Sequence, residues 1–95
     1  MSGYVYMMAS GPYGTLYVGV TATLSKRVWQ HKEGQGSAFT RKYAVHRLVH
    51  YERYEDIRDA IHREKRLKKW ERGWKIELIE KDNPAWSDLY ETLNQ

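Results

Sequence analysis

The feature that most constrains this fold is a pair of β-forming runs separated by a short turn-forming cluster. The first run, residues 3–9, reads Gly-Tyr-Val-Tyr-Met-Met-Ala, and the second, residues 15–20, reads Thr-Leu-Tyr-Val-Gly-Val. Between them, residues 10–14 contain two glycines and a proline, residue types that favour turns. This arrangement predicts a β-hairpin at the start of the chain.

A short helix is expected next, because Leu24, Arg27, Val28 and His31 recur at helical spacing along one face. The glycine-rich residues 34–37 should end it, and a loop should run from there to about Ala44. Residues 46–51 have the composition of a third strand.

The rest of the chain is predicted to be helical. A helix begins at Asp56, and its apolar stripe consists of Ile57, Ala60, Ile61 and Leu67. Gly73 should break or bend this helix, and the apolar pattern of residues 74–79 predicts another helix that ends at Asp82. Residues 83–84, Asn-Pro, are typical of a cap and first helical position, so a final helix should run to about Leu93. The order β-β-α-β-α-α-α indicates an α/β fold in which helices pack against a small sheet.

Composition excludes several classes of protein. The chain has no cysteine, which excludes disulfide scaffolds, thiolate metal sites and a cysteine nucleophile, and is compatible with a reducing cytoplasm, where we expect the protein. The longest apolar run, residues 4–9, has six residues, whereas a membrane span needs about 20. No cationic segment precedes that run, as one would in a secretory signal. We therefore expect one globular domain over residues 1–95 that makes no membrane contact.

One carboxylate falls in an unexpected position on the helix from Asp56. At about 100° per residue, Glu64 lies in the middle of the apolar stripe, whereas the neighbouring charges lie on the flanks and back. A carboxylate on a core-facing side is costly unless it is paired or holds a cation. Two interpretations stay open at this point. Glu64 either forms an ion pair or reaches water, or it is a ligand for Mg²⁺ or Mn²⁺, which take oxygen donors.

The first helix carries a second unusual pair. Arg27 and His31 are four residues apart and share a face with Leu24 and Val28. The arginine is suited to binding phosphate, and the histidine can shuttle a proton near neutral pH. The alternative is an ordinary helix edge from which both side chains reach solvent.

Two tyrosines of the hairpin form the third constellation. If the turn is centred between Gly11 and Pro12, Tyr6 lies directly opposite Tyr17 on the same face of the sheet. This prediction depends on the register, and ordinary cross-strand packing is the alternative.

Taken together, these constellations resemble the GIY-YIG nuclease domain over nearly the whole chain. The first motif reads Tyr4-Val5-Tyr6 and the second Tyr17-Val18-Gly19. Residues 27–31 resemble the Arg-x-x-x-His helix of the family, and Glu64 resembles its metal-binding glutamate. The chain is most similar to small stand-alone bacterial members. It departs from the pattern in two ways: the glycine of the first triplet is Tyr4, and the isoleucine of both triplets is valine.

The resemblance implies a three-stranded antiparallel sheet flanked by helices and a metal-dependent endonuclease activity on nucleic acid, with DNA favoured over RNA. It implies one divalent ion, Mg²⁺ or Mn²⁺, held by Glu64. It also implies that Tyr6 acts as general base, which requires nearby positive charge because a free tyrosine has a pKa of about 10. Tyr17 would position the water or phosphate, Arg27 would clamp the phosphoryl oxygens, and His31 would bind phosphate or assist proton transfer. Asn83 is a candidate for the late asparagine that the family often has near the site.

The net charge is +4, and the cations are unevenly distributed, with seven among the thirteen residues 63–75. Such clusters favour phosphate contacts without a sequence code. The residues expected to contact nucleic acid are Lys32, Arg41, Lys42, Arg63, Lys68 and Lys69. We interpret the tryptophans as packing residues. A non-catalytic binding module, or a subunit of a larger repair complex whose protein partner supplies specificity, stays open as the alternative function.

Overall fold

Three antiparallel strands form the centre of the fold in the computed structural model, which describes residues 1–93. The central strand β1 (Gly3–Ala9) pairs on one side with β2 (Leu16–Thr21) and on the other with β3 (Arg47–Tyr54). β2 and β3 are therefore the two edges of the sheet. The predicted fold class, a small antiparallel sheet flanked by helices, is confirmed.

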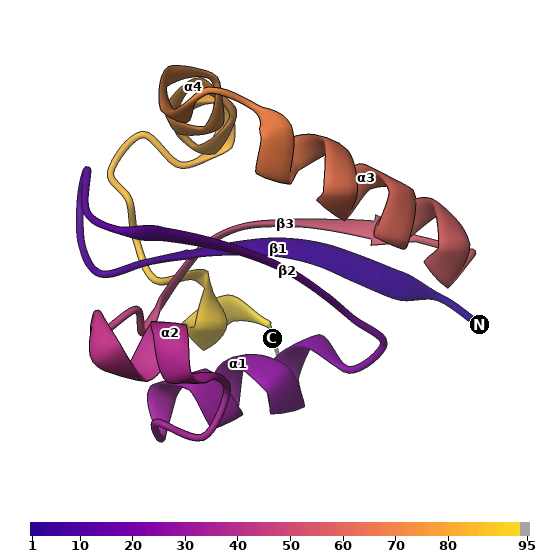
Figure 1. Cartoon of the computed structure of the whole chain (residues 1–95), viewed down its shortest axis with the longest axis horizontal. Coiled ribbons are helices and arrows are strands. Elements are labelled where there is room, and N and C mark those ends of the chain that lie inside the picture. The colour runs from indigo at the N-terminus through magenta and orange to yellow at the C-terminus, as the bar shows by residue number, and fades with distance from the viewer. Residues whose placement is uncertain (94–95) are drawn as a thin grey trace.

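Helices cover both faces of this sheet (Figure 1). On one face lie α3 (Ile57–Lys69) and α4 (Arg72–Asp82). On the other lie α1 (Leu24–Lys32), the five-residue α2 (Ala38–Lys42) and the short 3₁₀ helix η1 (Leu89–Thr92). None of the helices in residues 1–93 is both long and apolar enough to cross a bilayer.

Alternation along β1 divides the core into two clusters, because successive side chains point to opposite faces. Val5, Met7 and Ala9 pack under α3 and α4 together with Leu67 and Ile79. The opposite cluster packs under α1, and its buried members are Tyr6, Met8, Leu24, Val28, Val45 and Leu48. The first cluster is aliphatic apart from Trp86, whereas the second contains the hydroxyl of Tyr6.

The register of the hairpin differs from the predicted one. Tyr6 pairs with Gly19, and Tyr17 pairs with Met8, so the two tyrosines are diagonal neighbours instead of direct partners. The shift is two residues, which keeps both rings on the same face. It arises because the turn extends over Tyr13, which has a positive φ of 57° and donates a hydrogen bond from its hydroxyl to Glu80 at 2.7 Å.

Two predictions about the helices need correction. The predicted loop from Gly34 to Ala44 contains α2, which Ser37 caps by accepting a hydrogen bond from the Thr40 amide at 3.1 Å. Gly73 does not break the long helix: α3 ends at Lys69 and Gly73 lies in the first turn of α4. The break falls at Trp70, whose extended backbone accompanies stacking of its ring under Arg63.

No helix begins at Asn83, which instead ends α4. The Asn83 amide donates to the carbonyl oxygens of Val49 and Ser87, at 3.2 and 2.9 Å. These bonds hold the chain in an irregular turn, so only η1 is helical among residues 84–93. The third strand is also longer than predicted, because Glu52, although charged, lies in the strand paired with Val5.

Candidate active site

α1 brings its polar residues to the sheet because its buried face mixes Leu24 and Val28 with His31. The His31 side chain is completely buried, in contact with the face of the sheet that carries Tyr6. Its neighbours there are aromatic: the ring centroids of Tyr6 and Tyr17 lie 5.7 and 5.2 Å from that of His31. The predicted histidine therefore lies inside the protein and not at a solvated helix edge.

Tyr6 and His31 form a hydrogen bond in this interior, with 2.9 Å between Oη and Nε2. The Tyr6 ring lies across Gly19, where an added Cβ would come within 2.5 Å of the phenol oxygen. The glycine of the second motif is thus explained by space: only a residue without a side chain leaves room for the ring. The first-motif tyrosine and the second-motif glycine act as one packing unit.

Both partners of this hydrogen bond are uncharged. Burial, with smaller contributions from Arg27 and His46, lowers the pKa of His31 to about 4. Burial also raises the pKa of Tyr6 to about 12, although Arg27 acts in the opposite direction. Arg27 does supply the positive charge that the resemblance requires, but desolvation outweighs it. In the protein alone, Tyr6 is a neutral phenol and His31 a neutral imidazole.

Tyr17 connects this interior to the surface at the edge strand β2. It lines a groove of about 340 Å³ together with Leu16, Val18, Phe39, Lys68 and Lys75. These residues come from β2, α2, α3 and α4, so the groove spans the edge of the sheet and joins its two helical layers. Tyr17 contacts His31 on one side and Phe39 on the other, with ring centroids 5.2 and 6.1 Å apart.

Glu64 belongs to the opposite layer, on α3. Its carboxylate is 15 % exposed and pairs with Lys68 Nζ at 3.4 Å. Because Lys68 also lines the groove, this ion pair links Glu64 to the same edge of the sheet as Tyr17. Of the two interpretations of Glu64, the ion pair is present, and its partner is a lysine that is itself 54 % exposed.

This donor set suits a single divalent ion. Within residues 1–93, no three His, Asp or Glu side chains converge to form a metal site by themselves. Mg²⁺ commonly uses one or two carboxylates and completes its shell with water and substrate phosphate. The long contact to the half-exposed Lys68 leaves the Glu64 carboxylate open to displacement by a cation. A single carboxylate whose lysine partner lines the groove therefore fits an ion that takes one protein carboxylate.

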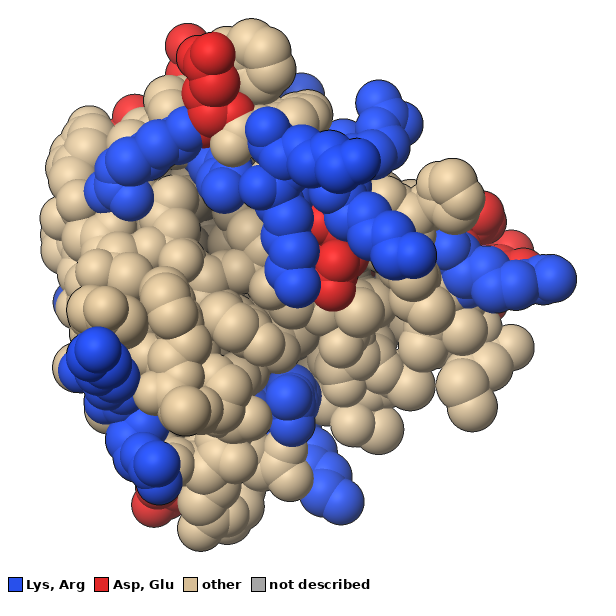
Figure 2. Space-filling view, viewed as in Figure 1, with Lys and Arg blue, Asp and Glu red and all other residues tan. Residues whose placement is uncertain are grey.

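Lysine and arginine side chains gather over the α3 and α4 layer and surround an acidic patch there (Figure 2). Of the six predicted contact residues, three form ion pairs within the fold, including Lys68 with Glu64. Lys32 pairs with Asp88 and lies over the Tyr90 ring, and Arg63 donates to Glu52 at 2.9 Å. Exposed at the surface are Arg41, Lys42, Lys68 and Lys69. These accessible cations lie on α2 and α3, and one of them, Lys68, lines the groove.

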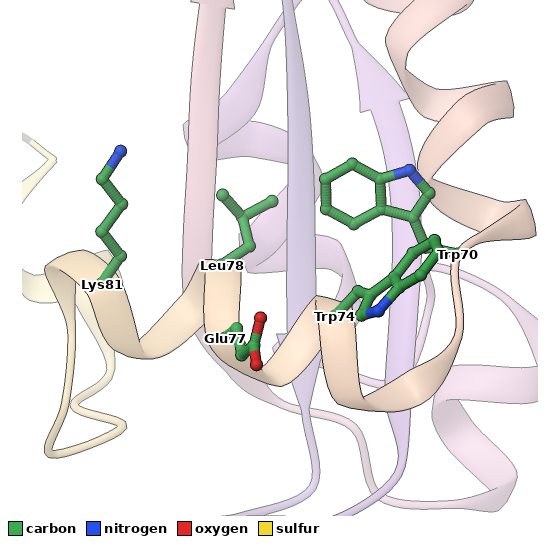
Figure 3. Close-up of a pocket in the computed structure, with 5 residues that line it drawn as sticks. All are labelled: Trp70, Trp74, Glu77, Leu78 and Lys81. Carbon is green, nitrogen blue, oxygen red and sulfur yellow. The ribbon is translucent and has the colours of Figure 1, made fainter.

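The candidate Asn83 and the tryptophans lie apart from this groove. Asn83 is buried and bonds to β3 and to Ser87, so its polar atoms hold the C-terminal segment in position. Trp70 and Trp74 stack edge to face, with centroids 6.1 Å apart, beside an apolar hollow on α4 (Figure 3). Trp86 is buried in the core, as expected for a packing residue.

Two residues that carry no strong sequence signal complete the site. Thr40 is buried, and its Oγ1 lies 3.0 Å from Nδ1 of His31. Gly36 lies so close to the same ring that a Cβ there would come within 1.9 Å of Nδ1. The spacing Ser37-x-x-Thr40 is a capping signal that could have indicated a helical turn here. Its contact with His31 depends on the tertiary fold.

Comparison with known proteins identifies relatives of this arrangement. Residues 2–77 match the family model of the GIY-YIG catalytic domain. A UPF0213 protein of Natronomonas pharaonis is 36 % identical over 76 residues, which cover 80 % of this chain and 88 % of the relative. A UPF0213 protein of Clostridium perfringens is 38 % identical over 76 residues, which cover 80 % and 81 %. The solution NMR structure of a UPF0213 protein from Bacillus halodurans is similar in fold, with a TM-score of 0.58, 26 % identity and 93 % of each chain covered.

Proposed function

Because the chain belongs to the GIY-YIG family and has its nuclease-type fold, we propose that it is a metal-dependent endonuclease that hydrolyses phosphodiester bonds. The observation that carries the proposal is the buried hydrogen bond between Tyr6 and His31, beside a groove that Tyr17 and Lys68 both line. An apolar pair would fill this space without the desolvation cost of the phenol hydroxyl and the imidazole nitrogens, which their hydrogen bond offsets only in part.

The pair accounts for activation of the attacking water. Tyr6 Oη takes a proton from water while its own proton passes to His31 Nε2, so neither step requires a free phenolate. The imidazolium that results is unfavourable in the empty protein, because burial lowers the pKa of His31 to about 4. The negative charge of a bound phosphodiester would stabilise the imidazolium and promote the transfer. The water oxygen then bonds to phosphorus, the bond to the leaving oxygen breaks, and that oxygen takes a proton from solvent.

The other residues have supporting roles in this proposal. Arg27, which is close enough to Tyr6 to affect its pKa, clamps the phosphoryl oxygens with its planar guanidinium. Tyr17 donates a hydrogen bond to the water or to the phosphate. A divalent ion, Mg²⁺ or Mn²⁺, held by Glu64 would neutralise charge that develops on the phosphoryl group. The exposed cations of α2 and α3 hold the nucleic acid backbone, and DNA is the favoured substrate.

The proposal is tested by cleavage assays with Mg²⁺ or Mn²⁺ on single-stranded, duplex and branched DNA and on matched RNA. We expect metal-dependent cleavage that Glu64→Ala reduces by about 10²-fold or more, the scale of losing a charge-stabilising group. Glu77→Ala is the matched control, since Glu77 is an exposed carboxylate on α4. Cleavage that continues unchanged in Glu64→Ala would contradict the metal role of this residue.

A second function is a nucleic-acid-binding module that does not cleave, either alone or with a protein partner that supplies specificity. The observation in its favour is that burial raises the pKa of Tyr6 to about 12 and that Lys68 pairs with the Glu64 carboxylate. Fluorescence anisotropy measures binding. Binding with no cleavage of any substrate, in Mg²⁺ or in Mn²⁺, would support this module and contradict the endonuclease function.

A further inference from the structure

The imidazole of His31 has a second hydrogen-bond partner that the proposed reaction does not use. Its Nδ1 lies 3.0 Å from Oγ1 of Thr40, and both residues are completely buried. We propose that Thr40 is a positioning residue, which keeps the proton of neutral His31 on Nδ1 so that Nε2 is free to accept the proton of Tyr6. The catalytic part of this inference rests on the proposed endonuclease function, whereas the position of the proton does not.

The assignment follows from counting donors. Thr40 has one hydroxyl hydrogen, and Oγ1 lies 3.2 Å from the carbonyl oxygen of Ser37, which can only accept. If the hydrogen is directed there, Oγ1 serves as an acceptor and His31 Nδ1 must carry a hydrogen. A neutral imidazole has only one N–H, so Nε2 is bare and accepts from the Tyr6 hydroxyl. Each polar atom then has a suitable partner.

Ser37 makes the opposite arrangement unfavourable. Its Oγ accepts from the Thr40 amide at 3.1 Å and lies 3.0 Å from Thr40 Oγ1, so its own hydrogen can be donated to that oxygen. Thr40 Oγ1 thus receives hydrogens from Ser37 and His31 while it donates to the Ser37 carbonyl. No buried side-chain nitrogen or oxygen in residues 1–93 lacks a partner, and this arrangement gives Ser37, Thr40 and His31 compatible donor and acceptor roles.

The surrounding segment holds Thr40 in this position. Gly36 contacts the imidazole so closely that no larger residue fits, which brings the start of α2 onto the ring. At the other end of α2, the Val45 amide donates to the Thr40 carbonyl at 2.8 Å. The charged or titratable groups that face His31 are Tyr6, Tyr17, Arg27 and His46. Among the hydrogen bonds of residues 1–93, none of these groups bonds to His31 Nδ1 in place of Thr40.

The position of the hydrogen on His31 sets the direction in which a proton can move between Tyr6 and His31. With hydrogen on Nδ1, the imidazole can take the phenol proton at Nε2, and the imidazolium that forms still donates from Nδ1 to Thr40. With hydrogen on Nε2 instead, His31 would be a donor toward Tyr6 and could not accept the phenol proton. Thr40 therefore acts through His31 and is not itself a catalytic residue.

The test is histidine ¹⁵N NMR of the full chain at neutral pH, combined with kinetics. In the wild-type protein we expect His31 to carry hydrogen on Nδ1 and a bare Nε2. Thr40→Val keeps the shape but removes the hydroxyl, so the His31 signals should change toward the other tautomer, whereas Thr40→Ser should restore them. We expect kcat to fall by about 10- to 100-fold in Thr40→Val with KM unchanged, and to recover in Thr40→Ser. Thr92→Val, at an exposed threonine on η1, is the control.

The outcomes separate the two proposals. Hydrogen on Nε2 of His31 in the wild-type protein overturns the inference even if Thr40→Val fails to fold. Unchanged His31 signals in a folded Thr40→Val protein also overturn it. A wild-type protein that does not cleave but carries hydrogen on Nδ1, with signals that respond to Thr40, contradicts the endonuclease function and supports the role of Thr40 in holding the tautomer.

Discussion

The two faces of the sheet bury polar side chains in different ways. Under α1, a chain of neutral groups runs from Tyr6 through His31 to Thr40, all almost completely buried. Under α3, Glu52 accepts hydrogen bonds from the side chains of Arg63 and His50 at 2.9 and 2.8 Å. The first of these networks is thus uncharged, whereas the second is charged and partly exposed.

The difference separates a neutral network, proposed to take part in catalysis, from a charged network that stabilises the fold. Burial would raise the pKa of Glu52, but hydrogen bonds from His50, Arg63 and Tyr54 together lower it to about 2, so this carboxylate stays charged. No comparable ion pair opposes the burial of His31, which remains neutral and available as a proton acceptor. The two faces meet at the edge strand β2, where the groove contains Tyr17 from one side and Lys68 from the other.

Lowering the pH should produce the largest change in the free energy of unfolding. The buried groups of the two faces should lose their contributions in different pH ranges. The pKa of His31 is lowered from 6.5 to about 4, so the unfolded chain binds a proton that the folded protein does not. Stability is therefore complete above pH 6.5 and falls by about 3 kcal/mol as the pH drops toward 4. Glu52, whose pKa is lowered to about 2, loses its contribution only below pH 4.5.

Urea unfolding at steps between pH 7.5 and 4.5 checks this order. The slope in that range should persist in Glu52→Gln and should be lost in His31→Gln, which can still accept from Tyr6. A free energy of unfolding that stays constant in the wild-type protein from pH 7 to 5 would contradict the neutral burial of His31.

Replacement by alanine should change the free energy of unfolding in opposite directions at two glycines. In Gly19→Ala the new methyl group would come within 2.5 Å of Tyr6, which should destabilise the protein by about 2 kcal/mol through overpacking. Gly73 lies in α4 with no atom within 4 Å of an added Cβ, so Gly73→Ala should stabilise by about 0.5 kcal/mol. Thermal unfolding of both variants measures the two effects. Equal tolerance at both positions would mean that the Tyr6 ring does not require the space over Gly19.

The sequence was sufficient for elements that local periodicity specifies. The apolar spacing of α3 and the β-forming composition of β1 predicted those elements, because both signals are local in the sequence. The spacing of Arg27 and His31 also indicated a shared face of α1. These patterns, together with the two tyrosine motifs, are enough to indicate the family from the amino-acid sequence.

Other features depend on contacts between distant residues. The hairpin turn includes Tyr13, whose hydroxyl donates to Glu80 on α4, and no local rule anticipates that bond. The helix α2 is too short to show a period and is held in part by the contact of Thr40 with His31. Likewise, a run of cations in the sequence does not indicate that Arg63 donates to Glu52. Helical spacing placed Glu64 on the core-facing side, and its partner Lys68 lies four residues later on the same helix, a spacing at which side chains meet.

The central claim is that both faces contribute to one reaction at the β2 edge, and a double-mutant cycle tests it most directly. Tyr6→Phe and Glu64→Gln are compared singly and together for the rate of metal-dependent cleavage. We expect each change alone to slow cleavage by about 10²-fold or more, and the double variant to be little slower than the slower single variant, because the groups act as a unit. Effects that multiply in the double variant would contradict the claim and assign the two residues to independent functions.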